Sequence, residues 1–335
     1  MAESWVEKRP LLGEEALSAP LPPERRDAWR RWVDRIGGHT MGGLAIGAAL
    51  LVVVVIVALL ARAWPILRAH SLKDLLLGRT WHPLQGVFGF WPFIVSTLWV
   101  TGLAMLIAVP VCTLCAIYMA EYAPSTVQQV LKPLIDLLAG IPSVVYGLWG
   151  VLIVVPLIRE RVGPWVDRHL GHVPFLSTAT NPTGYGVLAG GVVLAVMVFP
   201  LIISVMHEVL ESVPDGLREA TLALGVTRWI MVRKVILRQA LPGVVAAVVL
   251  GFSRALGETM AVLMVVGNVP QVPGSIFDAA YPLTSLIANN FGEMMSVPLY
   301  DAALMAAGLF LLLVVLGFNL AAWLVLRQTS LSRRV

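Results

Sequence analysis

Two ionisable residues, Arg254 and Glu258, interrupt an otherwise uncharged stretch of the chain. They lie in the segment SRALGETMAV, within a run from Ala240 to Asn268 that carries no other charge. In a continuous helix, residues four apart share one face and lie about 6 Å apart. A guanidinium offers planar donors that match the oxygens of an oxyanion, and a neighbouring carboxylate limits how tightly such an anion is held. Arg254, Glu258 and the adjacent Thr259 are therefore candidate residues of a solute path.

A structural interpretation of the same pair stays open beside the functional one. Arg254 and Glu258 can form a permanent ion pair, and removing either partner would strand a buried charge at a cost of several kcal/mol. In both interpretations the two side chains must point inward, away from lipid, because an arginine at the centre of a bilayer costs about 2.5 to 3.5 kcal/mol on insertion scales.

The elements that must position these residues are membrane-spanning helices. Of the 335 residues, 58% are hydrophobic and 13% are charged, whereas an average soluble domain has about 25% charged residues. A helix needs about 20 mostly apolar residues to cross the hydrocarbon core, where no water satisfies open backbone groups. The runs that meet this requirement are Gly42–Leu60, Ile94–Met119, Leu137–Ile158, Gly186–Met206, Leu241–Val266 and Ala302–Leu326. The sequence therefore predicts an all-α, polytopic membrane protein with six transmembrane helices, and places Arg254 and Glu258 near the middle of the fifth.

The distribution of basic residues predicts the orientation of these spans. Lys and Arg near the ends of a span stay on the cytoplasmic side during insertion. With the N-terminus inside, the inner segments carry more of these residues than the outer loops, although Arg62, Arg68, Lys73 and Arg79 fall in the first outer loop. We therefore expect both termini in the cytoplasm.

Residues 1–36 precede the first span and are expected to form a cytoplasmic tail, followed by a transmembrane domain over residues 37–335. The basic segment Arg25–Arg35 carries Trp29 and Trp32, a composition suited to a short helix lying on anionic headgroups. The alternative is a basic flank that only sets the topology. No cleavable signal peptide is expected, because the first apolar run is long enough to span.

Other chemistry-bearing patterns are weak or missing. The two cysteines, Cys112 and Cys115, are spaced C-x-x-C inside the second span, but such a pair lacks the further ligands of a zinc site, so both are predicted to be small buried side chains. The sequence has no G-x-x-x-x-G-K-[ST], H-E-x-x-H or G-x-S-x-G motif. We expect no covalent chemistry, so the energy for uphill transport would come from an ion gradient or another subunit.

The longest inner segment between spans, Glu208–Arg238, is predicted to fold as two short helices. Ser212 with Asp215 three residues later resembles a capping box, and Pro214 suits a first helical turn. An apolar stripe then follows at helical spacing, through Leu217, Ala220, Thr221 and Leu224.

The same segment carries signals for where the first of these helices ends and the second begins. Gly225 can adopt the left-handed conformation that ends a helix, which would stop at Leu224. Thr227 can cap a second helix through Trp229, Arg233 and Lys234. Such a bent pair could dock in a groove of another protein, or it could rest on the membrane surface.

A resemblance decides between these two alternatives. Glu219-Ala220-Thr221, followed after three residues by Gly225, resembles the E-A-A-x-x-x-G loop of ABC importer permeases, whose coupling helix sits in a cleft of the ATPase subunit. The sequence departs from the fuller family pattern, because Arg238 follows Val235–Leu237 where the family has a proline. Pro242 comes later, which leaves the start of the fifth span open.

Four further segments resemble the PstC-type permeases of phosphate-specific transport systems, over about Leu76–Leu326. They are the region Trp81–Pro83, MAEYAP (Met119–Pro124), AGIPSVVYGLWG (Ala139–Gly150) and RALGETMAVLMVVGN (Arg254–Asn268). PstA-type permeases share the R-A-x-G-E-T core, but the residues after that core in PstA-type chains are less like Met260–Val262 of this chain.

The resemblance implies a type I ABC importer permease in a bacterial inner membrane that works by alternating access. Its expected partners are a PstA-like permease, a PstB-like ATPase dimer that holds ATP and Mg, a PstS-like phosphate-binding protein and membrane lipids, with no nucleic acid. This chain itself is expected to bind no cofactor. Coupling to the ATPase would use Glu219, Ala220, Thr221 and Gly225, and the outer loop Asn268–Val297 could meet the binding protein.

One arginine cannot neutralise a phosphate dianion, so we expect the second permease to supply another cation or helix dipoles. A break at Gly140, Pro142, Ser143 and Gly147 could expose backbone groups to the path, or could serve only helix packing. The alternatives to phosphate are molybdate or sulfate. Alternatives of another class are an ion-coupled secondary transporter and a membrane sensor.

Overall fold

The structure is a computed structural model, and it describes residues 25–170, 173–178, 181–293, 297 and 299–331. The chain divides into two compact units, Met1–Ala58 and Leu59–Val335, each of which is described by itself. Of the expected tail over 1–36, residues 1–24 lie outside the described residues.

The first unit is the N-terminal part of helix α1 (Arg25–Ala69), which begins in the basic segment and runs on without a break. The short surface helix predicted over Arg25–Arg35 is therefore not a separate element, because no residue between it and the first span stops the helix. The last turns of α1, from Leu59 on, belong to the second unit, where Ala63 and Ile66 are fully buried.

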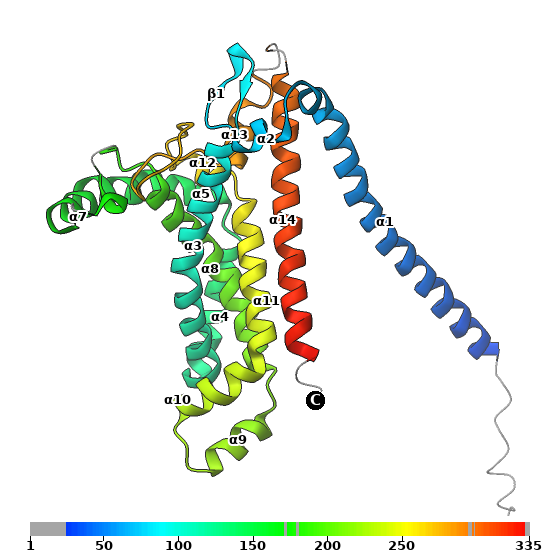
Figure 1. Ribbon diagram of the computed structural model, residues 1–335. Coiled ribbons are helices and arrows are strands. Elements are labelled where there is room, and N and C mark those ends of the chain that lie inside the picture. The colour runs from blue at the N-terminus through cyan, green and yellow to red at the C-terminus, as the bar shows by residue number, and fades with distance from the viewer. Residues whose placement is uncertain (1–24, 171–172, 179–180, 294–296, 298, 332–335) are drawn as a thin grey trace, which may run out of the picture. The chain divides into compact units, whose positions relative to one another are not determined.

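A small aromatic cap closes one end of the second unit, which we call the hairpin end (Figure 1). It consists of α2 (Leu72–Leu77), strands β1 (Trp81–His82) and β2 (Val87–Phe88), and the 3-10 turn η2 (Pro83–Gln85) between the strands. The strands pair antiparallel, with Trp81 opposite Phe88. Trp81 packs edge-on against Phe88 and Phe93, with ring centroids 5.5 and 4.9 Å apart.

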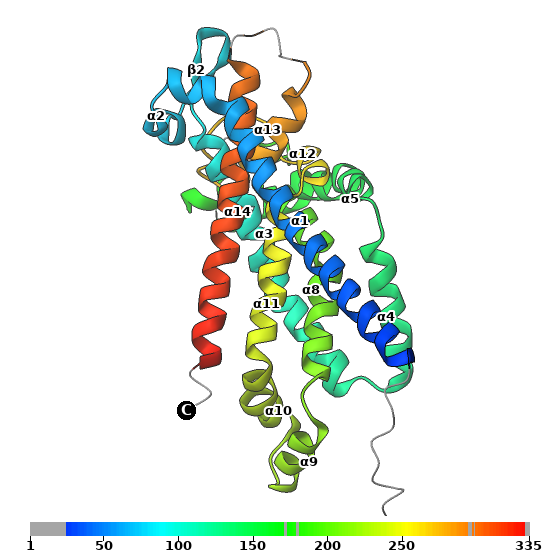
Figure 2. The same cartoon turned by 90° about the vertical axis from the view of Figure 1, so that its right-hand side faces the viewer.

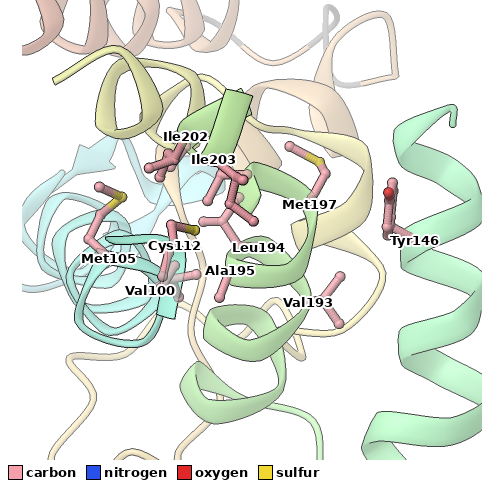
Figure 3. Close-up of a cluster of buried hydrophobic side chains, with 14 of the residues drawn as sticks. Val100, Met105, Cys112, Tyr146, Val193, Leu194, Ala195, Met197, Ile202 and Ile203 are labelled. Atoms are coloured by element: carbon pink, nitrogen blue, oxygen red, sulfur yellow. The ribbon is translucent and has the colours of Figure 1, made fainter. Parts of the chain in front are cut away.

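Two long helices, α3 (Trp91–Ile117) and α8 (Val187–Glu211), form the centre of the bundle. The core around them contains Val100, Met105 and Cys112 from α3 and Leu194, Ala195 and Ile202 from α8 (Figure 3). Cys112 is buried as predicted, whereas Cys115 is exposed, contrary to the prediction. The π-helical turn η3 (Tyr118–Tyr122) ends α3.

The chain returns from α3 through two helices instead of one. Helix α4 (Ser125–Ala139) ends before Gly140–Pro142, and a helical stretch from Ser143 to Leu170 follows. That stretch consists of α5 (Ser143–Trp149), η4 (Gly150–Val154), α6 (Val155–Leu157), η5 (Ile158–Val162) and α7 (Gly163–Leu170), and a 3-10 turn η6 (Pro174–Leu176) comes after it. The third span therefore starts later than the predicted Leu137.

At the other end of the bundle, which we call the α9 end, helix α9 (Asp215–Ala223) connects α8 to the next long helix (Figures 1 and 2). The long helix that follows α9 consists of α10 (Arg228–Met231), the π-helical turn η7 (Val232–Ile236) and α11 (Leu237–Leu256). Pro242 lies inside α11, so the proline does not mark the start of the span.

The last part of the chain contains two short helices and one long one, namely α12 (Met260–Leu263), α13 (Leu283–Asn290) and α14 (Tyr300–Leu331). Among the described residues, six helical stretches are long and apolar enough to cross a membrane, as predicted. They are Trp32–Ala69, Trp91–Tyr122, Ser143–Leu170, Val187–Glu211, Arg228–Leu256 and Tyr300–Leu324.

Candidate functional site

The helix that carries Arg254 ends before it reaches Glu258. Helix α11 stops at Leu256, and Gly257 to Thr259 form an irregular link to α12. The expectation that Arg254 and Glu258 share one face of a continuous helix is therefore wrong. Gly257 ends α11 with right-handed backbone angles, φ −88° and ψ −3°.

The break lies deep in the bundle, far from either end of α14. The Ser253 hydroxyl donates to Oδ1 of Asn319 on α14 at 2.9 Å, and the rings of Phe252 and Phe318 stack with centroids 3.9 Å apart. At 1.5 Å per residue, Asn319 lies roughly 28 Å along α14 from Tyr300. Both views show α11 ending beside the middle part of α14 (Figures 1 and 2). Arg254 is thus in the last turn of its helix but remains at membrane depth.

The Arg254 side chain is exposed on the surface of this chain. Within the described part of the chain no carboxylate lies within ion-pair distance of it, and none of the ion pairs present includes Glu258. The permanent ion pair of the structural interpretation is therefore not formed, and Arg254 does not point into this subunit's core as expected.

Glu258 and Thr259 are partly buried and hold the break together. The Glu258 carboxylate accepts a hydrogen bond from the Ala261 N–H at 3.3 Å, in the first turn of α12. The Glu258 carbonyl accepts the Thr284 hydroxyl of α13 at 2.9 Å, and the Thr259 carbonyl accepts the Leu263 N–H at 2.9 Å. Glu258 thus binds the first turn of α12, and no carboxylate of the described residues pairs with Arg254.

A second helix break packs beside the first. The chain leaves helical geometry between α4 and α5, and the Tyr146 hydroxyl donates to the Leu138 carbonyl at 2.9 Å across this break. Gly147 then allows α5 to approach α12, since a Cβ there would lie 2.6 Å from Met264 Sδ and 3.2 Å from Ala261 Cα. The predicted interruption therefore exists at Gly140–Pro142, whereas Gly147 serves close packing. The role of Tyr146 had no signal in the sequence beyond its place in AGIPSVVYGLWG.

The segment after α12 fills the hairpin end of the bundle instead of forming a free loop. Tyr281 and Leu283 donate their backbone N–H groups to the hydroxyls of Ser96 and Thr97 on α3, at 3.1 and 3.0 Å. Residues from Phe277 to Leu286 are buried. Much of the loop Asn268–Val297, which could have met the binding protein, is therefore packed inside this subunit.

The coupling segment at the α9 end folds close to its prediction. Helix α9 covers Asp215–Ala223, Leu224 follows as its cap, and Gly225 has a φ of 76° in the left-handed region. The Thr227 hydroxyl accepts the Ile230 N–H at 3.4 Å and caps α10. Ser212 does not form the expected capping box, because it ends α8 and its hydroxyl donates to the Val209 carbonyl at 2.7 Å.

The predicted coupling residues lie on an open surface. Glu219, Ala220 and Gly225 are exposed and Thr221 is partly exposed. The expected apolar stripe is exposed too, with 81% of Leu224 and 38% of Leu217 accessible. An apolar surface of this kind, outside the membrane-spanning helices, is typical of a site that another protein covers.

One strong contact of this segment was not predicted. Arg218 of α9 forms an ion pair with Glu121 of η3 at 3.1 Å, and the two side chains are 15% and 4% exposed. Glu121 belongs to the segment MAEYAP, but the two residues are far apart in sequence and show no shared pattern. Among the described residues no cluster of three or more His, Cys, Asp or Glu side chains could hold a metal ion.

Comparison with known proteins supports this architecture. Residues 112–330 match the family model described as "Binding-protein-dependent transport system inner membrane component". The PstC phosphate transport system permease of Haemophilus influenzae is 36% identical over 88% of this chain and 93% of its own. That of Pasteurella multocida is 38% identical over 81% of this chain and 84% of its own.

A solved structure shares the fold. A bacterial alginate ABC transporter, crystallised in complex with its pentasaccharide-bound periplasmic protein, includes a chain with a TM-score of 0.51. It is 19% identical, and the match covers 90% of this chain and 96% of that one. This chain therefore belongs to the inner-membrane components of binding-protein-dependent transport systems, and among them to the PstC-type permeases.

Proposed function

We propose that this chain is the permease subunit of an ATP-driven importer of inorganic phosphate and forms half of its translocation path. The curated relatives are named as phosphate transport permeases, and the six apolar helices indicate a multi-pass membrane protein. In the proposed orientation, α9 and both termini face the bacterial cytoplasm, and the hairpin end faces outward.

The observation that carries the proposal is an exposed arginine beside a helix break at membrane depth. A guanidinium facing lipid there would be strongly unfavourable, so Arg254 must face another protein subunit or water. Broken helices that expose backbone groups near the midplane are typical of substrate sites in transporters. Arg254 offers the donors for phosphate oxygens, and Glu258 and Thr259 fix the break from which it projects.

The exposed face around Arg254 favours a second membrane subunit. Leu250, four residues before Arg254 on the same face of α11, is 46% exposed, and Met260, after the break, is 49% exposed. A PstA-like permease that covers them would enclose a path between the two chains, and would add the positive charge that one arginine lacks for a dianion. The proposed transport unit is thus a heterodimer in which Arg254 lies at the interface.

The coupling function is assigned to α9 and its flanks. A PstB-like ATPase dimer, which would hold ATP and Mg, covers Glu219, Ala220, Thr221 and Gly225, and this chain carries out no catalysis itself. Closure of the dimer moves α9 and reorients the spans, so the path opens alternately to the two sides of the membrane. A PstS-like protein delivers phosphate, and linkage requires that delivery and closure influence each other.

Reconstitution of the complete complex in proteoliposomes tests this proposal. We expect ATP-dependent phosphate uptake that stops when the ATPase is omitted. Excess unlabelled phosphate should reduce the uptake of labelled phosphate more than excess molybdate or sulfate does. Uptake driven by an ion gradient without the ATPase would instead identify a secondary transporter. The absence of uptake in any assembly would favour a sensor.

A second arm of the same experiment tests the coupling surface. Glu219→Ala should loosen the ATPase, so less of it copurifies with the permease. Glu160→Ala is a suitable control, because that exposed carboxylate lies in the third span and pairs with the adjacent Arg159. Equal retention of the ATPase by both variants would remove Glu219 from the proposed contact.

A further inference from the structure

Helix α9 has almost no apolar attachment to the rest of the chain. None of the nine residues of α9, all of which the structure describes, is buried. Its leucines, Leu217 and Leu222, are 38% and 39% exposed. Forces applied to α9 by a partner must therefore pass through its polar contacts or through the two links that join it to α8 and α10.

Arg218 supplies the main polar contact. One of its terminal nitrogens donates to the Leu210 carbonyl at 2.7 Å, and the other donates to the Val213 carbonyl and to Oδ1 of Asp215 at 2.9 Å. This arrangement uses the planar fork of donors that only arginine offers. The guanidinium thereby ties α9 to the end of α8.

The same guanidinium also reaches the end of α3. Its Nε donates to Oε1 of Glu121 at 3.1 Å, and a terminal nitrogen lies 3.1 Å from the same oxygen. Arg228 of α10 adds a bond at 3.3 Å to the carbonyl of Glu121. Arg218 therefore connects α9 to the ends of α8 and α3. Glu121, at the end of α3, also accepts the bond from α10.

We propose that Arg218 is a positioning residue of the transport cycle: through its ion pair with Glu121 it transmits movement of α9 to α3 and α8. This inference rests on the proposed function, because it requires that an ATPase moves α9. Because the pair is mostly buried, it is screened less by water and salt than a surface pair, so it can hold two elements in one geometry. Without the pair, α9 would move with the ATPase while α3 stays in place.

A purely structural pair makes a different prediction. If Arg218 and Glu121 only help the chain to fold, their removal lowers the amount of complex, but every complex that assembles transports normally. If the pair transmits movement, assembled complexes hydrolyse ATP without the matching uptake. The ratio of ATP hydrolysed to phosphate transported, per assembled complex, separates these two roles.

The test uses the complete complex in proteoliposomes with Arg218→Gln and, separately, Glu121→Gln. We expect the ratio of ATP hydrolysed to phosphate transported to rise by at least about tenfold in Arg218→Gln, within the range of coupling free energies between linked sites. Glu121→Gln keeps an acceptor oxygen and should raise the ratio less. Arg218→Lys keeps the charge but not the fork, so its ratio should lie between the wild type and Arg218→Gln.

The matched control is the ion pair of Lys132 with Glu211, at 3.2 Å, which joins α4 to α8 without involving α9. Lys132→Gln should leave the ratio unchanged. An unchanged ratio in assembled Arg218→Gln and Glu121→Gln complexes would overturn the inference, provided that the wild type couples hydrolysis to uptake.

Two further outcomes are also decisive. If Arg218→Gln does not assemble, Glu121→Gln decides the question, and failure of both to assemble would assign the pair to folding and overturn the inference. A wild-type complex without ATP-driven uptake would instead refute the proposed function itself.

Discussion

Two arginines of this chain occupy environments opposite to those that their positions suggest. Arg254, at membrane depth, is exposed and has no ion pair among the described residues, whereas Arg218, outside the membrane-spanning helices, is 15% exposed and bonds to four acceptor groups. A buried charge needs full satisfaction, while an exposed charge at bilayer depth needs a partner from outside the chain. The comparison indicates that the charge of Arg218 is satisfied within this subunit, whereas in the proposed complex the charge of Arg254 is satisfied by a second subunit or by water.

The largest expected effect is the loss of phosphate uptake when Arg254 is replaced. Arg254→Ala should lower phosphate uptake by at least about 100-fold, because it removes charge-assisted donors from the proposed path. The complex should still assemble, since no described contact within this chain depends on a pair with Arg254. Uptake and the yield of complex should be measured together with Arg159→Ala as a control, because Arg159 pairs with its neighbour Glu160. Failure of assembly would show that Arg254 is structural.

The second prediction concerns the geometry of the coupling segment. A Cβ at Gly225 or at Gly216 meets no atom within 4 Å, but only Gly225 has a positive φ. Gly225→Ala should therefore cost about 1 to 2 kcal/mol in the native bend, whereas Gly216→Ala should not weaken α9. Retention of the ATPase during copurification should fall in the first variant only. Equal retention in both would mean that the bend does not set the coupling surface.

The third prediction tests the break beside Arg254. Tyr146→Phe removes one hydrogen bond to the Leu138 carbonyl, which still accepts the Ile141 N–H at 3.2 Å, and should lower the free energy of unfolding by about 0.5 to 1.5 kcal/mol. Tyr118→Phe is the control, because the exposed Tyr118 hydroxyl makes no hydrogen bond to the described residues. Thermal unfolding of the purified complex measures the difference, and similar melting of both variants would remove Tyr146 from this role.

The smallest expected effects are on stability, and they distinguish the hydroxyl of Thr227, which caps a helix, from that of Ser212, which does not. Thr227→Ala removes the cap of α10 and should lower stability by about 1 kcal/mol. Ser212→Ala removes only a hydroxyl that donates back into α8, so its effect should stay within about 0.5 kcal/mol. Equal losses in thermal unfolding would restore the capping role first predicted for Ser212.

Local signals in the sequence predicted the coupling segment well. Gly225 and Thr227 act on residues within one turn, so their types were enough to place the bend and the second helix. The six apolar stretches were also predictable, because the hydrocarbon core imposes their length and composition. In contrast, Ser212 was assigned to the wrong helix, because α8 continues to Glu211 and uses Ser212 at its own end.

Features that depend on tertiary contacts were not predictable. Nothing in the run around Arg254 marks the end of α11, because a glycine within an apolar helix often remains helical. The break is stabilised by Thr284, far along the chain, which donates to the Glu258 carbonyl. The ion pair of Arg218 with Glu121 likewise joins segments that the sequence does not connect. Burial of the segment before α14 depends on hydroxyls of α3, which no local signal in the sequence of that segment indicated.

The most direct test of the central claim is thiol labelling of Arg254→Cys in the assembled complex. The labelled variant also carries Cys112→Ala and Cys115→Ala, because the exposed Cys115 would otherwise react with the reagent as well. We predict that a small charged thiol reagent modifies Cys at position 254 in the heterodimer, and that phosphate slows the reaction. No reaction in any nucleotide state, while the heterodimer remains intact, would show that this position is sealed from water and would contradict the account.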